Sequence, residues 1–430
     1  MSLQARDHKV IWHPFTQAAT APVPLPVVAA KGSWLELADG KRVFDAISSW
    51  WTCLSGHSHP AIVAAIADQA ARLDHVLFAG CTHPGAVELA ERLLEIAPTG
   101  MSRVFYSDDG STAVEVALKL AIQYHAQNGH PGRQRFLALA GGYHGDTIGA
   151  MSVGDPVDFS GPFSPLLWPV GRLPVPLVHG DALAGNVDCT AELAELDRTL
   201  DRHGDSLAAV IVEPLLQGAG GMRTYAPEFL RQLAKKARER GILLIADEVM
   251  TGFGRTGAMF ACQHAEITPD LLCIAKGLTG GTLPLAATMA PEWIYERFLG
   301  DSARQAFLHG HSFTANPIAC AAALANLRVM RDEGLLNKAQ ALHQWYAQSL
   351  PSLLDHPQVH RVRWLGSIGV VELHGHGYHD AAQSTRLQRR CLDRGVLIRP
   401  LGPVLYTLPP LTADVGELRE VWRVISESLP

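Results

Sequence analysis

Three short runs of apolar residues in the middle of the chain constrain its fold more than any other feature. The runs are Leu207–Val212, Ile242–Ala246 and Leu271–Ala275, and each has the length of a strand. Continuous apolar runs of this length are typical of strands buried on both faces, as in a parallel sheet covered by helices. We expect Tyr225–Arg240 to be the helix between the first two strands. The sequence therefore predicts an α/β fold with a mostly parallel central sheet.

The segments on either side extend this prediction to the whole chain of 430 residues, a length that suits two or three domains. Before the central runs we expect an extended arm over residues 20–28, a strand over Arg103–Ser107, a helix over Thr112–Gln127 and an irregular surface loop over Gly154–Gly185. After them, a helix from Asn337 and the strand candidates Ile368–Leu373 and Gly395–Arg399 indicate a smaller α+β domain. We expect an N-terminal arm with part of the small domain over 1–60, a large ligand-binding domain over 61–325, and a C-terminal small domain over 326–430.

Composition and charge exclude several classes of protein. The net charge of −6 gives no basic surplus, so we expect no nucleic-acid partner. The first residues lack the apolar stretch of a signal peptide, and no run approaches the about 18 apolar residues of a membrane span. Seven cysteines without a CxxC pair indicate reduced thiols, each best explained as a small buried apolar residue, in a cytoplasmic protein.

Two polar residues follow neighbouring runs of the predicted sheet. Asp247 follows the run ILLIA and Lys276 follows LLCIA, and ligands gather at the carboxyl ends of such strands. Taken singly, Asp247 is equally well explained as a loop cap or the partner of an arginine, and Lys276 as a surface residue of a flexible loop. Together they match pyridoxal phosphate, which needs an amine for its aldehyde and an acid that faces its ring nitrogen.

Two further segments offer groups that suit this cofactor. Gly110 and Ser111 lie where the turn after RVFYS opens the next helix, a position that favours a phosphate, although ordinary helix capping explains a serine there as well. The loop His309–Ser312 supplies additional donors. Tyr143, in GGYHGDT, presents a ring that suits stacking on a flat cofactor, while core packing is its default explanation.

The chain has 20 histidines, some of them in close pairs such as His57 and His59. No HExxH motif and no carboxylate set at metal-ligand spacing accompanies them. We therefore expect no metal site. A nicotinamide-binding Rossmann enzyme is also disfavoured, because DGSTA after the early strand lacks the second and third glycines of GxGxxG.

A long segment of the chain resembles a known family. The blocks LLIADEVMTGFGRTG and PDLLCIAKGLTGG, the second containing Lys276, are similar to those of the class III (subgroup II) aminotransferases. This resemblance implies fold type I of the pyridoxal-phosphate enzymes, the aspartate aminotransferase-like fold, with a mostly parallel sheet in a large domain and a smaller α+β domain. Within the family, the motifs WHP, SSWW, YHGDT, QGAGGM and IRP resemble the members that make 7,8-diaminononanoate in biotin synthesis.

The resemblance implies a role for each matching residue. Lys276 bonds to the cofactor and moves the proton, Asp247 pairs with the ring nitrogen, and Tyr143 stacks on the ring. The remaining implied assignments are Gly110, Ser111, His311 and Ser312 for the cofactor, and Phe15, Trp50, Trp51, Tyr143, Asp146, Arg255, Gly310 and Arg399 for the substrates. Arg399 is expected to bind the acceptor carboxylate in a two-pronged ion pair. A homodimer is implied, with Ser312 reaching the site of the neighbouring subunit.

The implied reaction transfers an amino group to 8-amino-7-oxononanoate, with S-adenosylmethionine as the donor. Two positions depart from the pattern of the relatives that use this donor. Phe15 stands where they have tyrosine, and His311-Ser312 stands where they have Pro-Thr. L-Lysine as the donor, another ω-amino acid as substrate and an aminomutase reaction therefore stay open. A regulatory protein of this fold is disfavoured, because no basic helix-turn-helix segment precedes residue 60.

Overall fold

The central feature of the fold is a seven-stranded sheet, seen in a computed structural model that describes residues 1–155, 161–185, 187–375 and 381–429. The strand order is β4-β14-β13-β12-β9-β5-β6. In that order the strands span Met101–Ser107, Ala286–Pro291, Leu271–Ile274, Leu243–Asp247, Leu207–Val212, Arg135–Leu139 and Gly171–Leu173. Strand β14 pairs antiparallel with both neighbours and the other pairs are parallel, which confirms the predicted mostly parallel sheet.

Helices cover both faces of this sheet, as the apolar runs predict. In β9, Val210 and Val212 pack into one buried cluster with α7 (Thr190–His203) and α8 (Pro227–Glu239). The alternate residues of the same strand pack into another cluster with α5 (Gly110–Gln127). Side chains of a strand alternate between its faces, so a strand that is apolar throughout serves two cores at once.

The structure has further helices, and the sequence marks the start of several of them. They are α1 (Leu3–Val10), α2 (Ser48–Trp51), α3 (Pro60–Arg72), α4 (Pro84–Ile96), α6 (Ile148–Val153), α9 (Glu292–Tyr295), α10 (Pro317–Asp332), α11 (Leu335–Ser349), α12 (Ala381–Asp393) and α13 (Val415–Ser428). Prolines open α3, α4 and α10, where the missing N–H costs no hydrogen bond. Asp414 and Glu417 cap α13 reciprocally.

Three smaller sheets complete the structure. One has the order β1-β2-β3-β17, over Val27–Lys31, Trp34–Leu37, Arg42–Asp45 and Val396–Leu397. A second has the order β18-β16-β15-β8, over Val404–Thr407, Ile368–Leu373, Val359–Leu365 and Gly180–Asp181. A third joins β10 (Leu216–Gln217), β11 (Arg223–Tyr225) and β7 (Leu177–Val178).

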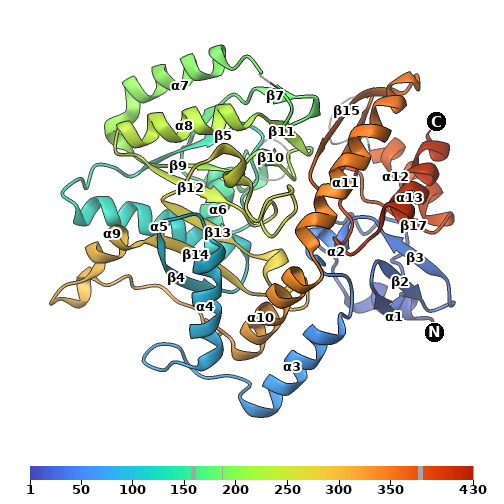
Figure 1. Cartoon of the computed structure of the whole chain (residues 1–430), viewed down its shortest axis with the longest axis horizontal. Helices are drawn as coiled ribbons and strands as arrows, with labels where there is room; N and C mark the ends of the chain where they lie inside the picture. The colour runs from blue at the N-terminus through green and yellow to red at the C-terminus, as the bar shows by residue number, and fades with distance from the viewer. Residues whose placement is uncertain (156–160, 186, 376–380, 430) are drawn as a thin grey trace.

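The two ends of the chain form one region, which Figure 1 shows as blue strands beside red helices. Phe44 and Ala46 share a buried cluster with residues of α11, α13, β15 and β16. The domain limits predicted at residues 60 and 325 remain predictions. Because α10 runs through residue 325, we propose that the second limit lies at the end of that helix.

Three segments differ from their predicted form. Of the loop predicted over 154–185, residues 156–160 lie outside the described residues, and Gly171–Leu173 form edge strand β6 of the main sheet. The strand predicted over Gly395–Arg399 shortens to the two residues of β17. The predicted helix 112–127 begins two residues earlier, at Gly110, because Asp109 caps it. Strands of two or three residues form because they pair with a neighbouring strand, and they are too short to show a periodic pattern in the sequence.

Candidate active site

The two strand-end residues singled out in the sequence lie in the walls of one cavity. Strands β12 and β13 are parallel neighbours; Asp247 ends the first, and Lys276 follows the second by two residues. Both therefore lie at the carboxyl edge of the sheet. The cavity has a volume of about 400 Å³. Its other lining residues include Trp51, Thr52, Gly110, Ser111, Tyr143, His144, Gly145, Glu213, Met250, Gly281 and Leu285.

Lys276 is held in a conformation that its surroundings must enforce. Its φ is 42°, in the left-handed region that costs a residue with a side chain on the order of 1 kcal/mol. Its Nζ atom lies 4.8 Å from the centroid of the Trp51 ring. Burial lowers the pKa of Lys276, and the nearby Asp247 offsets part of that shift. A buried amine of lowered pKa is a better nucleophile near neutral pH.

Asp247 has a partner that the sequence prediction missed. Its Oδ2 lies 2.7 Å from Nδ1 of His144, and its Oδ1 accepts a hydrogen bond of 3.1 Å from the backbone N–H of Val249. Both side chains of the pair are almost fully buried. These contacts fix the carboxylate and satisfy its charge where little water reaches it. The signal was available: His144 follows Tyr143 directly in the motif that the sequence singled out.

Glu213 is a second buried carboxylate of the cavity that was missed. It follows β9 directly, and its two oxygens accept backbone hydrogen bonds of 2.9 Å from Tyr143 and 2.8 Å from Gly218. Burial raises the pKa of Glu213 to about 7, and His144 opposes that shift. The reasoning that singled out Asp247, a carboxylate at the carboxyl end of an apolar strand, applies equally to Glu213.

The other end of the cavity is shaped for an anion. Gly110 and Ser111 begin α5, whose free N–H groups and dipole favour negative charge. Asp109 caps the helix, so the Ser111 hydroxyl is not used as the cap; it accepts a 3.3 Å hydrogen bond from the backbone of Asp146. A Cβ on Gly145 would lie 2.1 Å from the Ser111 Oγ atom, so only glycine allows this close approach.

Trp50, Trp51 and Arg399 are arranged by a left-handed turn. The four residues Ser48–Trp51 have φ values between 43° and 73°. Consecutive left-handed residues are costly, and such strain gathers at functional sites. The turn directs Trp51 into the Lys276 cavity. It leaves Trp50 partly exposed and outside the lining of that cavity. The centroid of the Trp50 ring lies 4.6 Å from the Arg399 guanidinium carbon and 5.7 Å from the centroid of the Phe15 ring.

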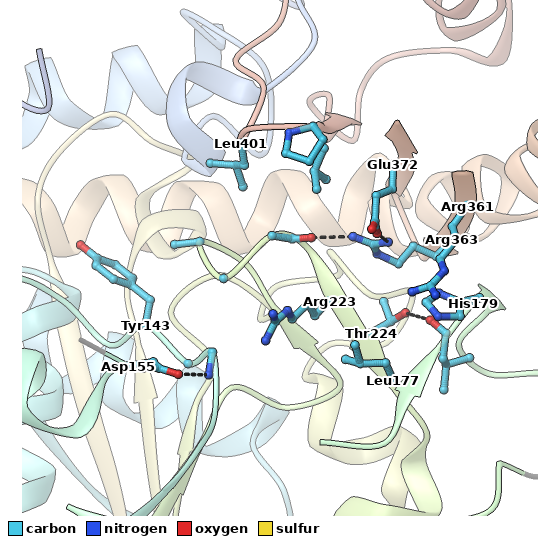
Figure 2. A pocket seen from close by; sticks show the side chains of 18 residues that line it. Tyr143, Asp155, Leu177, His179, Arg223, Thr224, Arg361, Arg363, Glu372 and Leu401 are labelled. Carbon is cyan, nitrogen blue, oxygen red and sulfur yellow. Dashed lines mark hydrogen bonds and ion pairs between the residues drawn. The ribbon is translucent and has the colours of Figure 1, made fainter. Parts of the chain in front are cut away.

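Tyr143 separates the Lys276 cavity from a second one of about 460 Å³. Figure 2 shows Tyr143 at one end of this second cavity and Arg361 and Arg363 towards the other. Arg363 donates to Glu372 at 2.7 Å and to the carbonyl of Met222 at 2.6 Å, so it is held by the protein itself. Burial raises the pKa of Tyr143, and Asp146 adds to the shift, so its phenol stays protonated at neutral pH.

The remaining predicted residues lie outside the cavity walls. Arg255 is buried behind them, where its Nη1 donates to the carbonyl of Pro409, and burial lowers its pKa to about 9. Asp146 is exposed. Gly310, His311 and Ser312 lie on a largely exposed loop that is not part of the Lys276 cavity in this chain.

In the described ranges no group of three or more His, Cys, Asp or Glu side chains is arranged to hold a metal ion. No helix there is both long and apolar enough to cross a membrane.

Comparison with known proteins gives matches over nearly the whole chain. The family model described as Aminotransferase class-III matches residues 15–429. The adenosylmethionine-8-amino-7-oxononanoate aminotransferase of Synechococcus elongatus is 49% identical over 425 residues, which cover 98% of this chain and 99% of the relative. The relative of the same name from Geobacter sulfurreducens is 41% identical, over 97% of this chain and 95% of its own.

Solved structures agree with the sequence matches. The crystal structure of adenosylmethionine-8-amino-7-oxononanoate aminotransferase from Methanocaldococcus jannaschii has a TM-score of 0.92 and 35% identity, and the match covers 99% of this chain and 98% of the other. An amine transaminase from an uncultivated Pseudomonas species, solved in its PLP-bound form, has a TM-score of 0.90 and 34% identity, with 98% of both chains covered. The predicted fold class is thereby confirmed.

Proposed function

This chain belongs to the class-III aminotransferases, and from that membership we propose that it uses pyridoxal 5′-phosphate, bonded to Lys276, to transfer an amino group to 8-amino-7-oxononanoate. The product is 7,8-diaminononanoate, as in the biotin pathway. One observation carries the proposal: an amine and a buried carboxylate, each at the end of a parallel strand, line the same cavity. The names of the relatives supply the substrates.

The lining of the cavity fits this cofactor part by part. Lys276 supplies the amine for the aldehyde, and Asp247 the acid for the ring nitrogen. The first turn of α5, with Gly110 and Ser111, suits the phosphate. A Cβ on Gly110 would lie 2.5 Å from Val249 Cγ1, so this close approach of helix α5 to the segment after β12 needs a glycine. Tyr143 is placed to cover one face of the ring.

Proton transfer falls to Lys276. When bound, pyridoxal phosphate supplies an electron-withdrawing ring that stabilises negative charge on the carbon from which the proton is taken. With the cofactor bound, the Lys276 Nζ atom would accept that proton and return it at the neighbouring position. Its lowered pKa favours this, because the amine must be free of its own proton to act as a base. Asp247, which contacts His144, would keep the ring nitrogen protonated.

The acceptor carboxylate is assigned to Arg399. A guanidinium binds a carboxylate with two parallel hydrogen bonds, and Trp50, on which Arg399 is stacked at 4.6 Å, limits the directions it can take. Trp51 lines the cavity and supplies the apolar wall that an aliphatic chain requires. Asp146 and Arg255 are assigned to the recognition of the donor. Asp146 would act through its hydrogen bond with the Tyr143 side chain, and Arg255 would act from its buried position behind the cavity wall.

S-Adenosylmethionine is proposed as the donor, following the names of the relatives. Phe15, which contacts Trp50 edge to face, has no hydroxyl to offer that donor. L-Lysine therefore stays as the alternative donor, and other ω-amino acids as alternative substrates. The intact Trp50-Trp51 pair favours S-adenosylmethionine.

A homodimer with shared sites is proposed as the working form, in the cytoplasm. Gly310, His311 and Ser312 carry expected cofactor and substrate contacts, yet they lie outside the Lys276 cavity of their own chain. Their exposed loop suits a contribution to the site of a second copy. Sedimentation of the protein, with and without Ser312→Ala, distinguishes a dimer from a monomer.

The purified holoenzyme tests the substrates directly. It is incubated with 8-amino-7-oxononanoate and either S-adenosylmethionine or L-lysine, and diaminononanoate is measured by mass spectrometry. We expect product with S-adenosylmethionine, and less product when Arg399 is replaced by glutamine. If diaminononanoate forms with L-lysine and not with S-adenosylmethionine, L-lysine is the donor. Absence of product with both donors, from a protein that carries the cofactor, contradicts the proposed acceptor.

A further inference from the structure

Three side chains beside the left-handed turn form a row that the proposed reaction does not use. The Sγ atom of Cys53 lies 3.6 Å from Nδ1 of His57, and Nε2 of His57 lies 2.8 Å from Oδ2 of Asp45. Ser49 donates a 2.7 Å hydrogen bond to the same carboxylate oxygen. Because the thiol and the carboxylate contact opposite edges of the imidazole ring, the three groups do not converge on one point. The arrangement suits a protonated imidazole that donates to the thiol on one edge and to the carboxylate on the other, and it does not suit metal binding.

The charges along this row favour a positive imidazole. Burial raises the pKa of Asp45, but hydrogen bonds from His57 and Ser49 outweigh this and hold it below its usual value. Burial likewise lowers the pKa of His57, and its bonds to Asp45 and Cys53 reverse the shift and raise it to about 10. His57 is thus protonated at neutral pH. The guanidinium of Arg255 is a second cation that interacts with Cys53 and Asp45.

The other cysteines have different surroundings. Burial raises the pKa of each of five thiols, which are Cys189, Cys262, Cys273, Cys320 and Cys391. Cys81 is exposed. Cys53 is buried, with 7% of its surface exposed, but its sulfur faces a cation. A cation beside a cysteine stabilises the thiolate, which is the nucleophilic form.

We propose that Cys53 is a reactive nucleophile, activated by His57 and Asp45, and a site of covalent modification by small electrophiles such as hydrogen peroxide and haloacetamides. With peroxide, the sulfur attacks one oxygen, the S–O bond forms, the O–O bond breaks and hydroxide leaves. The sulfur is oxidised by two electrons and the peroxide is reduced by two. With iodoacetamide, a C–S bond replaces the C–I bond and iodide leaves.

Modification of Cys53 also reaches the Lys276 cavity. Gly281 packs so closely on the turn that a Cβ there would lie 2.6 Å from the Thr52 carbonyl carbon and 2.7 Å from the Cys53 backbone nitrogen. Thr52 and Gly281 both line the cavity. Atoms added to the sulfur would press on this closely packed segment of the wall. We therefore expect modification of Cys53 to lower the aminotransferase activity.

Alkylation of the holoenzyme measures the reactivity without relying on any activity. The protein is treated with iodoacetamide between pH 6 and pH 9, and each cysteine is followed by peptide mass spectrometry. We expect Cys53 to be alkylated at least about tenfold faster than Cys81 at pH 6, because His57 presents a cation to its sulfur. The exposed Cys81 serves as the internal reference.

Matched variants assign the cause. His57→Asn should slow alkylation of Cys53 about tenfold or more at pH 6 and leave Cys81 unchanged. Asp45→Asn should have a smaller effect in the same direction. If a variant unfolds, its buried cysteines react together, and the rates measured in the unsubstituted chain then decide alone. Alkylation of Cys53 that is no faster than alkylation of Cys81 at pH 6 overturns the proposal.

The activity arm uses hydrogen peroxide. The wild-type enzyme should lose amino transfer in step with the mass added to Cys53. Cys53→Ala should keep its initial rate within about twofold and resist the same exposure at least about tenfold longer. Equal inactivation of the Cys53→Ala variant contradicts the link between Cys53 and the cavity. If the chain is inactive with every donor, the alkylation rates can still be measured. The proposed aminotransferase function and the proposed reactivity of Cys53 can therefore fail separately.

Discussion

Two histidine–aspartate pairs lie near the turn that contains Trp51, and each acts on a different nucleophile. His144 and Asp247 are 2.7 Å apart, and there the carboxylate acts electrostatically on the amine Lys276. In the other pair, His57 and Asp45 are 2.8 Å apart, and the imidazole faces the thiol of Cys53. An amine is matched with an anion and a thiol with a cation. Both pairs join a histidine to an aspartate. The nucleophile that each pair activates depends on whether the carboxylate or the imidazole faces it.

The largest difference between the two regions should follow removal of each nucleophile. Lys276→Ala should lower the initial rate of amino transfer by at least about a thousandfold, because it removes both the bond to the cofactor and the proton carrier. Cys53→Ala should leave the rate nearly unchanged in the absence of oxidant. Lys235→Ala, at an exposed position, is the control for loss of a lysine. If the initial rate of the Lys276→Ala enzyme is within about tenfold of the wild-type rate, the two regions do not differ in their contribution to amino transfer, and the comparison fails.

The second comparison exchanges each carboxylate for its amide. Asp247→Asn should lower the rate by about a hundredfold to a thousandfold, since a neutral amide no longer keeps the cofactor ring nitrogen protonated. Asp45→Asn should change the rate only a few fold, because that carboxylate acts on Cys53. Steady-state kinetics with saturating cofactor separate the two. Similar losses in both variants would mean that Asp45 belongs to the catalytic machinery as well.

Much of this comparison was open to sequence reasoning, and some was not. Asp247 and Lys276 were predicted because each follows a continuous apolar run, and such runs place their ends at one edge of a parallel sheet. Glu213 carries the same signal after the run Leu207–Val212 and was overlooked. The Asp247–His144 contact joins residues 103 positions apart, which no local pattern encodes.

The Cys53 row lies close in sequence and was nevertheless missed. Asp45, Cys53 and His57 span a short segment, but their contact depends on the left-handed turn at Ser48–Trp51. No glycine marks that turn, so propensity gives no warning of it. The edge strand β6 was hidden for another reason: three residues, Gly171–Leu173, are too few to show a period.

The third prediction concerns stability and its dependence on pH. Asp45→Asn should lower the free energy of unfolding by about 1–3 kcal/mol at pH 7, because it leaves a buried imidazolium without its partner. His57 has a pKa raised from 6.5 to about 10, so its stabilisation is complete below about pH 6.5 and is lost as the pH rises through about 10. The lowered pKa of Asp45 sets the acid limit, below which the same stabilisation is lost.

Urea unfolding followed by tryptophan fluorescence at pH 7 and above pH 10 checks this expectation. The gap between the wild type and Asp45→Asn should shrink at the higher pH. Lys41→Gln, which removes an exposed cation near the same strand, is the control and should show no such change. A gap that is equal at both values would show that the pair is not charged in the folded protein.

The smallest effect is expected where the histidine only supports the carboxylate. His144→Asn should lower the rate about fivefold to tenfold, the net worth of one hydrogen bond at about 1.0–1.4 kcal/mol. His57→Asn should leave the rate almost unchanged while it slows alkylation of Cys53. A loss at His144 as large as that at Asp247 would make the histidine a direct participant in proton transfer.

The most direct measurement of the central claim locates the cofactor on the chain. The holoenzyme is treated with borohydride, which reduces the carbon–nitrogen double bond between the cofactor and a lysine, and the tryptic peptides are weighed. We predict that the phosphopyridoxyl group is found on Lys276, in the peptide that contains LLCIAKGLTGG. A label on any other lysine, or none on a protein that binds the cofactor, contradicts the account.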